Sequence, residues 1–155
     1  MTTNADERDL VLTRLMEAPR ARLWRCWTEP ELLKKWFTPP PFVVTRAEMD
    51  VRTGGNSFVV MRGPDGQEMP IPGMYLEVEK ERKLVFTDAY VGDWKPSQKP
   101  FMTAIVTFAD EGNKTRYTAT ARHWSMEDRE AHEKMGFHTG WGIAADQLEA
   151  LAKTL

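Results

Sequence analysis

Three histidines and one aspartate are the side chains of this sequence that could transfer a proton near neutral pH. His123 ends a segment rich in β-forming residues, 115–123, and lies at the mouth of a cavity if its side of that strand faces inward. Otherwise His123 is a hydrogen-bonded structural histidine at a strand edge. His138 is a further candidate acid or base, and catalysis requires two such groups to converge on one substrate position.

Asp88 lies in an apolar run, 84–91, on the same side as Phe86 and Tyr90 if the run is a strand. If that side faces inward, burial raises the pKa of the Asp88 carboxyl group and suits it to act as a general base, with Tyr90 as a hydrogen-bond donor. If the strand ends or bulges there, Asp88 is solvated. We favour the second interpretation, because strand boundaries are hard to place from one sequence.

These residues do not have the spacing of a metal site. His132 and His138 are six residues apart, which is about 240° around a helix, whereas zinc-binding helices use spacings of three or four. The single cysteine, Cys26, lies on the apolar side of an expected helix and fits a small core residue. Phosphate-binding and nucleophile motifs are also missing from the sequence. We therefore predict neither a metal nor a cofactor.

The composition is that of an ordinary globular protein. Its 155 residues correspond to one domain, with 41% hydrophobic and 28% charged residues. The formal net charge is −2 and no block of like charges occurs, so nucleic acid is not an expected partner. No apolar run is long enough for a membrane span and the polar beginning lacks a signal core, so we expect a cytoplasmic location.

The spacing of apolar residues predicts one α+β domain over residues 9–155, preceded by a polar tail, 1–8. A strand over 9–17 leads into a short helix that begins near Pro19, because proline suits the first turn. A second short helix follows, and its expected start is a capping box at 28–31.

The middle of the sequence is β-forming and its end is helical. Between residues 42 and 123 the pattern predicts six further strands in an antiparallel meander. A capping box at 125–128 then begins one long helix, 126–153. Gly136 and Gly140 cost this helix about 1 kcal/mol each relative to alanine. Either the helix approaches the sheet closely at these glycines, or they leave room for a ligand.

Bulky apolar residues are abundant, with six Trp, seven Phe and nine Met. A curved sheet and one helix leave space between them, so we expect either a core packed with aromatic side chains or a cavity. Small residues on adjoining strands, such as Ala119 and Ala121, favour a cavity. The assignment depends on the strand register, because a slip of one residue reverses the two faces. The residues expected to line the cavity are Trp36, Phe58, Val60, Phe86, Tyr90, Met102, Ala104, Met135, Phe137 and Trp141.

Several short motifs, in this order along the chain, resemble one known family. They are LLKKWFTPPPF at 32–42, D-x-R-x-G-G at 50–55, MRGPDG at 61–66, G-x-Y-L-E-V at 73–78, LVFT at 84–87, R-H-x-S-x-E-D-R-E at 122–130 and M-G-F-x-x-G-W at 135–141. As an ordered set they are similar to the bacterial, single-domain members of the family named for activators of the ATPase of the ninety-kilodalton heat-shock chaperone.

The resemblance implies the helix-grip fold of START-like (SRPBCC, birch-pollen-allergen-like) proteins. In this fold a curved, seven-stranded antiparallel sheet wraps around a long C-terminal helix, two short helices follow the first strand, and a cavity lies between sheet and helix. Members of the superfamily bind lipids, hormones and polyketides, and some are cyclases or hydrolases.

The resemblance leaves three functions open. The first is binding of a small apolar or amphipathic molecule, the second is a cyclase- or hydrolase-type enzyme that uses the same cavity, and the third is a chaperone-activating interaction module. Eukaryotic activators contact the chaperone through a separate N-terminal domain that this sequence lacks. We therefore expect a small ligand rather than a chaperone as the partner. The sequence does not decide whether a homodimer forms through a sheet edge or a helix face.

Overall fold

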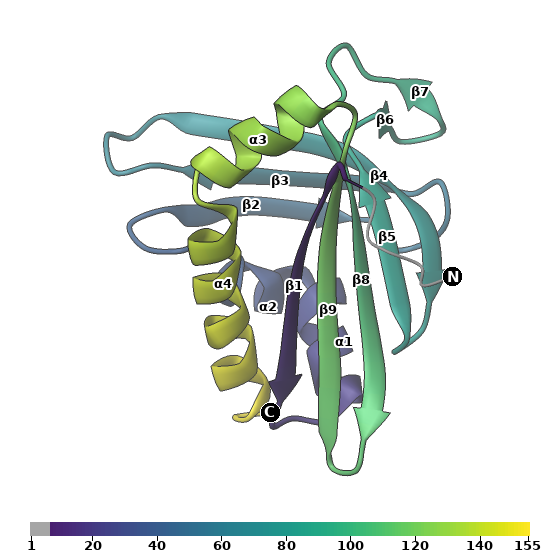
Figure 1. The fold of residues 1–155 in the computed structure, drawn as a ribbon, viewed down its shortest axis with the longest axis vertical. Coiled ribbons are helices and arrows are strands. Elements are labelled where there is room, and N and C mark those ends of the chain that lie inside the picture. Colours follow the sequence, from purple (N-terminus) through teal and green to yellow (C-terminus); the bar gives the residue numbers. More distant parts are fainter. Residues whose placement is uncertain (1–6) are drawn as a thin grey trace.

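The fold is built on a seven-stranded antiparallel sheet that curves around helices on one of its faces (Figure 1). It is described by a computed structural model of residues 7–155, so residues 1–6 of the predicted tail lie outside the description. The sheet order is β1-β9-β8-β5-β4-β3-β2. This α+β architecture confirms the predicted helix-grip fold. The elements in chain order are β1 (Asp9–Met16), α1 (Arg20–Thr28), α2 (Pro30–Trp36), β2 (Val43–Met49), β3 (Asn56–Arg62), β4 (Glu68–Glu79), β5 (Lys83–Thr87), β6 (Tyr90–Val91), β7 (Lys95–Pro96), β8 (Met102–Glu111), β9 (Lys114–His123), α3 (Met126–Lys134) and α4 (Phe137–Ala152).

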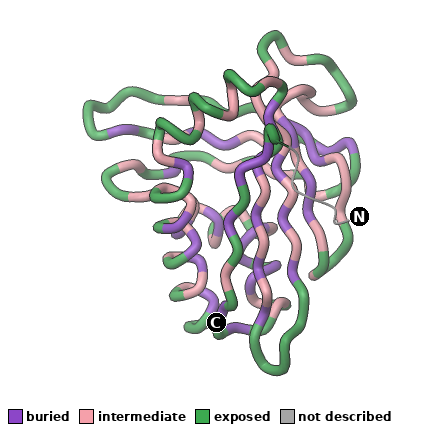
Figure 2. Tube along the Cα trace, viewed as in Figure 1, coloured by how far each residue is buried: buried purple, intermediate pink, exposed green. Residues whose placement is uncertain are grey.

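Residues that face each other across antiparallel strands share one side of the sheet, and they define its concave face. One row runs from Phe86 through Ala104 and Ala121 to Leu10, across β5, β8, β9 and β1. The neighbouring row pairs Met102 with His123. Figure 2 shows the alternation that results, with buried and exposed residues following one another along β1. The predicted phase of β5, β8 and β9 therefore agrees with the structure.

The two short helices close one end of the sheet with aromatic side chains. The indole nitrogen of Trp36 donates a hydrogen bond to the Cys26 carbonyl oxygen at 2.9 Å, and its ring lies 4.9 Å from that of Trp27. The predicted capping box at 28–31 is wrong. Thr28 still belongs to α1, where its hydroxyl donates to the Trp24 carbonyl, and α2 begins at Pro30 without a side-chain cap.

The predicted C-terminal helix of 126–153 is two helices, which is a correction. Its start is as expected, because the Ser125 hydroxyl accepts a hydrogen bond from the Asp128 amide at 3.1 Å. The break comes at Gly136, which has a φ of +97°, a left-handed conformation that ends α3. A Cβ at Gly136 would meet nothing within 4 Å. Close packing therefore does not explain this glycine, whereas its left-handed conformation makes the turn between α3 and α4.

Gly140 lies inside α4 and offers a stabilising substitution. A Cβ at this position would meet nothing within 4 Å, so alanine adds no clash. We expect Gly140→Ala to raise the free energy of unfolding by about 1 kcal/mol, because it removes the conformational freedom of glycine in a helix. Urea denaturation measures this gain. Gly142→Ala is the control, because its Cβ would lie 3.1 Å from Nη2 of Arg14 and the gain should be smaller.

The segment that connects β5 to β8 packs on the outer side of the sheet. The short strands β6 and β7 form a hairpin within the region expected to be a loop. The Trp94 amide points at the Met74 sulfur at 3.3 Å, and the Tyr90 and Trp94 rings lie 5.6 Å apart. Tyr90 therefore packs on this hairpin and does not line the interior as predicted. No helix within residues 7–155 is both long and apolar enough to cross a lipid bilayer.

Candidate functional site

Two histidines from different elements form a hydrogen-bonded pair at the end of the concave face. His123, the last residue of β9, is only 2% exposed. Its Nδ1 atom lies 2.8 Å from the carbonyl oxygen of Arg8, and its Nε2 atom lies 2.8 Å from Nδ1 of His132 in α3. The inward phase predicted for His123 agrees with this position. Arg8 was assigned to the polar tail, but its backbone holds the His123 ring.

Aromatic rings surround the second histidine of the pair. The His132 ring centroid lies 5.3 Å from Phe101, 5.3 Å from Phe137 and 5.8 Å from Trp141. Burial among these rings, helped by the neighbouring His123, lowers the pKa of His132 from 6.5 to about 4. His132 is therefore uncharged at pH 7 and can take part in hydrogen bonds as a neutral imidazole.

Asp88 holds the backbone beside this pair instead of facing a substrate space. Strand β5 ends at Thr87, and Oδ1 of Asp88 accepts hydrogen bonds from the amides of Phe101 at 2.8 Å and Met102 at 3.2 Å. Burial raises the pKa of Asp88, and the backbone hydrogen bonds oppose this rise. The favoured prediction of a strand end is confirmed. The carboxyl group, however, is half-buried and bonded, which differs from the solvated state expected with it.

Substitutions at Asp88 should separate its hydrogen bonds from its charge. Asp88→Ala leaves two amides without their acceptor, so we expect it to lower the free energy of unfolding by about 2 kcal/mol. Asp88→Asn keeps an acceptor oxygen and removes a desolvated charge, so we expect a change of less than about 0.5 kcal/mol at pH 7. Guanidinium denaturation of both variants measures this. Equal losses would show that the charge, not the acceptor, is what matters.

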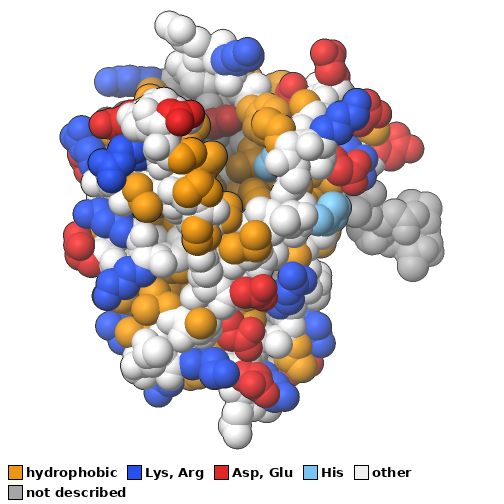
Figure 3. Space-filling model, turned by 90° about the vertical axis from the view of Figure 1, so that its left-hand side faces the viewer, with side chains coloured by type: hydrophobic (Ala, Val, Ile, Leu, Met, Phe, Trp, Pro, Cys, Tyr) orange, Lys and Arg blue, Asp and Glu red, His pale blue; other side chains and the backbone are white. Residues whose placement is uncertain are grey.

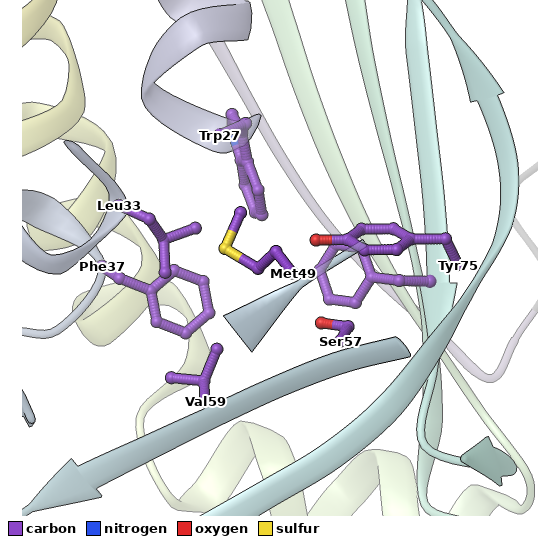
Figure 4. A pocket seen from close by; sticks show the side chains of 8 residues that line it. Trp27, Leu33, Phe37, Met49, Ser57, Val59 and Tyr75 are labelled. Carbon is purple, nitrogen blue, oxygen red and sulfur yellow. The ribbon is translucent and has the colours of Figure 1, made fainter. Parts of the chain in front are cut away.

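A second polar pair lies deeper in the interior, in an apolar pocket of about 20 Å³ (Figure 4). The hydroxyl of Tyr75 points into this pocket, close to that of Ser57. Burial raises the pKa of Tyr75 to about 12, and its hydrogen bond with Ser57 offsets only part of that rise. A pocket of this volume has room for about one water molecule. Its lining residues are Trp27, Leu33, Phe37, Met49, Ser57, Val59, Tyr75 and Phe86.

The D-x-R-x-G-G segment, 50–55, fixes the position of Tyr75. Asp50 and Arg52 pair at 2.8 Å, Gly54 donates to the Tyr75 carbonyl at 2.8 Å, and the Tyr75 amide donates to Gly55 at 3.0 Å. Gly54 has a φ of +83°, which few residues other than glycine adopt. The motif is therefore a tight turn that anchors β4 where its Tyr75 enters the pocket.

Four of the residues predicted to line a cavity surround the two polar pairs. Phe86 lines the small pocket, and Met102 lies opposite His123 on the concave face. Phe137 and Trp141 pack on His132. Ala104 is on the same face as Phe86 and Met102 but is 1% exposed, so it is covered by its neighbours.

Four other predicted lining residues, and His138, lie elsewhere. Phe58 faces the outer side of β3 beneath the guanidinium of Arg46, and Val60 shares that side, because Ser57 and Val59 face the pocket. The three remaining residues are either sealed in the core or on the surface: Trp36 is 2% exposed, Met135 is 71% exposed, and His138 lies at the surface 3.6 Å from Glu133.

The interior is closed at one end of the sheet and open at the other. Leu84 and Leu148 are completely buried, whereas Phe86, Met102 and Trp141 remain partly exposed although they pack toward the core. Figure 3 shows hydrophobic side chains around a hollow in the upper part of the face formed by the C-terminal helices, with a histidine at its rim. We call the hollow that Figure 3 shows the interior hollow, and we infer that the partly exposed core residues Phe86, Met102 and Trp141 border it.

Comparison with known proteins identifies the family. The family model described as activator of Hsp90 ATPase homolog 1-like protein matches residues 17–153. The chain belongs to this family. A protein of known crystal structure from Nitrosomonas europaea is 42% identical in sequence to this chain. The match covers 97% of each chain with a TM-score of 0.94. No curated protein matches the chain.

More distant solved structures extend the likeness. A Mycobacterium smegmatis protein is 29% identical, covers 96% of this chain and 92% of its own, and has a TM-score of 0.80. A Rhodobacter sphaeroides protein is 18% identical with a TM-score of 0.85 over 99% of this chain and 97% of its own, which is a likeness of fold alone. Membership of the activator-homolog family therefore agrees with the fold.

Three residues of the site, His132, Tyr75 and Ser57, were not predicted from the sequence. His132 was compared only with His138, because both fall in one expected helix, whereas its partner is His123 across a short connection. Tyr75 lies inside the G-x-Y-L-E-V motif, two residues after Gly73, but the motif gives no sign that its hydroxyl enters a pocket. No sequence signal pointed to Ser57.

Proposed function

We propose that this protein binds a small apolar or amphipathic molecule in the interior hollow between the sheet and the helices α3 and α4. One observation carries the proposal. Phe86, Met102 and Trp141 are large apolar side chains directed at the core, yet each keeps surface that solvent can reach. An occupant that covered this surface would gain about 0.8 kcal/mol for each methylene group that it removed from water.

The polar groups around the hollow support an amphipathic occupant. The His123–His132 pair lies near one wall, and the hydroxyls of Ser57 and Tyr75 lie in the pocket beside Phe86. Ligand sites combine a mainly apolar lining with a few placed polar groups. The pocket itself is too small for a metabolite, so the ligand occupies the open hollow. Met49, a flexible side chain in the pocket, can shift to extend that space.

The geometry supports binding better than acid–base catalysis. A histidine with a pKa of about 4 is a weak base at pH 7, whereas efficient general bases have a pKa near the working pH. Asp88 accepts hydrogen bonds from two backbone amides with Oδ1, which gives this carboxyl group a role in holding the backbone. A cyclase or hydrolase mechanism therefore has less support here than retention of a ligand.

The test is native mass spectrometry of the purified protein, followed by organic extraction of any molecule that leaves it. Fluorescence of 1-anilinonaphthalene-8-sulfonate then reports the apolar space directly. Met102→Trp fills the hollow from β8, and Ile105→Trp adds the same bulk on the outer face of the same strand as a matched control. We expect the first variant alone to lose the bound mass and the fluorescence. Equal signals from both variants would contradict the proposal, provided circular dichroism shows both folded.

A further inference from the structure

The hydrogen bonds of the histidine pair define where its protons lie. The carbonyl oxygen of Arg8 accepts a hydrogen bond from the backbone amide of His123 at 3.1 Å. The same oxygen lies 2.8 Å from Nδ1 of His123. A carbonyl oxygen carries no proton, so Nδ1 of His123 must be the donor. In a neutral His123 ring the other nitrogen, Nε2, then has a lone pair and no proton.

The proton position in the second ring follows from that in the first. Nε2 of His123 lies 2.8 Å from Nδ1 of His132, and with a lone pair on the first atom the second must carry the proton. Nε2 of His132 is then left with a free lone pair. The series of hydrogen bonds that begins at the Arg8 carbonyl oxygen thus ends at Nε2 of His132. This nitrogen is an acceptor because the backbone carbonyl sets the tautomer of both rings.

This terminal nitrogen is unused within the described part of the chain. No residue of 7–155 donates a hydrogen bond to Nε2 of His132, and unlike the indole nitrogen of Trp27 it is not sealed from solvent. The rings of Phe101, Phe137 and Trp141 pack around the imidazole. An acceptor at the edge of such an aromatic surface suits a donor group attached to a flat apolar body.

We propose that Nε2 of His132 accepts a hydrogen bond from a hydroxyl or N–H group on a ring-containing, apolar ligand. His123 is a positioning residue, because it fixes which nitrogen of His132 carries the proton. The inference rests on the ligand-binding function proposed above and narrows it. The site selects a ligand with a neutral hydrogen-bond donor. A carboxylate is disfavoured because its oxygens would face the lone pair of Nε2 of His132.

Matched naphthalene probes test this selectivity by calorimetry at pH 7. We expect 2-naphthol to bind about tenfold more tightly than 2-methoxynaphthalene, as one hydrogen bond would give, and 2-naphthoate to bind more weakly than 2-naphthol. His132→Phe keeps an aromatic ring and should remove the preference for 2-naphthol. His138→Phe changes an exposed histidine nearby and should retain it.

Long-range proton–nitrogen spectra of the imidazoles give an independent readout without any probe. We expect an unprotonated Nε2 in His132 at pH 7, and its protonation state should change in His123→Phe, where Nδ1 of His132 loses its acceptor. A protonated Nε2 in the unaltered protein would overturn the inference. Equal binding of 2-naphthol and its methyl ether would also overturn it while leaving the proposed ligand binding intact. If none of the three naphthalene probes binds, the inference about His132 is overturned as well. Native mass spectrometry then tests separately whether the protein binds a ligand at all.

Discussion

Acidification from pH 7 to pH 4 should destabilise the protein by about 2 kcal/mol through His132 alone. The pKa of this residue is about 4 in the folded protein, against 6.5 for an unperturbed histidine. Below pH 6.5 the unfolded chain binds a proton that the folded protein does not, so stability is present above this pH and declines toward pH 4. The full shift corresponds to about 3 kcal/mol, which we reduce because the ring is partly exposed.

Urea denaturation at several pH values between 7 and 4 measures this loss. In His132→Phe the slope over that range should decrease, and in His138→Phe it should match the unaltered protein. The nearby Asp88 acts in the opposite direction, because a carboxyl group with a raised pKa contributes stability at low pH that is lost as the pH rises. Comparison within an Asp88→Asn background therefore isolates the histidine, with His123 retained in every variant. An unchanged slope in His132→Phe would contradict the prediction, because it would show that the pKa of this residue is the same in the folded and unfolded protein.

Among glycine-to-alanine substitutions in the tight turn at 50–55, Gly55→Ala should lower the free energy of unfolding most. A Cβ at this position would overlap the carbonyl oxygen of Asp50 and lie 2.9 Å from that of Arg52. Both are backbone atoms held by hydrogen bonds, so neither can move aside without opening the turn. We expect a loss of about 3 kcal/mol or more in the free energy of unfolding. The pocket should be affected as well, because the same turn anchors Tyr75.

Thermal and chemical denaturation of Gly55→Ala measure the effect, with Gly66→Ala as the control. Gly66 has a φ of +82°, but a Cβ there would meet nothing within 4 Å. That variant should lose only about 1 kcal/mol, which is the cost of a left-handed conformation for alanine. A loss in Gly55→Ala no larger than that in Gly66→Ala would contradict the prediction, because it would show that the turn accommodates the added Cβ.

How much of the fold could be predicted differs from strand to strand. In β8 and β9 the alternation of apolar and polar residues was clear, and the inward phase of Ala104 and His123 followed from it. In β3 the run Phe58-Val59-Val60 is apolar on both faces, so alternation could not choose between them. The bulge between Val44 and Arg46 in the neighbouring strand further obscures the register.

The site was predictable only where its parts are close in sequence. Periodicity placed Phe137 and Trp141 on one side of a helix, and they do share a contact with His132. The pairing of His132 with His123 depends on the angle at which α3 leaves β9, and Gly136 then redirects the chain into α4. Periodicity along one helix carries no information about such angles.

The pairing of β1 with β9 has a consequence for how the chain folds. These strands are adjacent in the sheet, and Leu10 lies opposite Ala121 although more than a hundred residues separate these two along the chain. Native contacts of such long range make folding slow, because a large loop must close before they are gained. During synthesis β1 must wait for residues 114–123 to emerge, and until then its apolar side chains lack their cover. The nascent protein is therefore expected to depend on protection from aggregation until β9 is available.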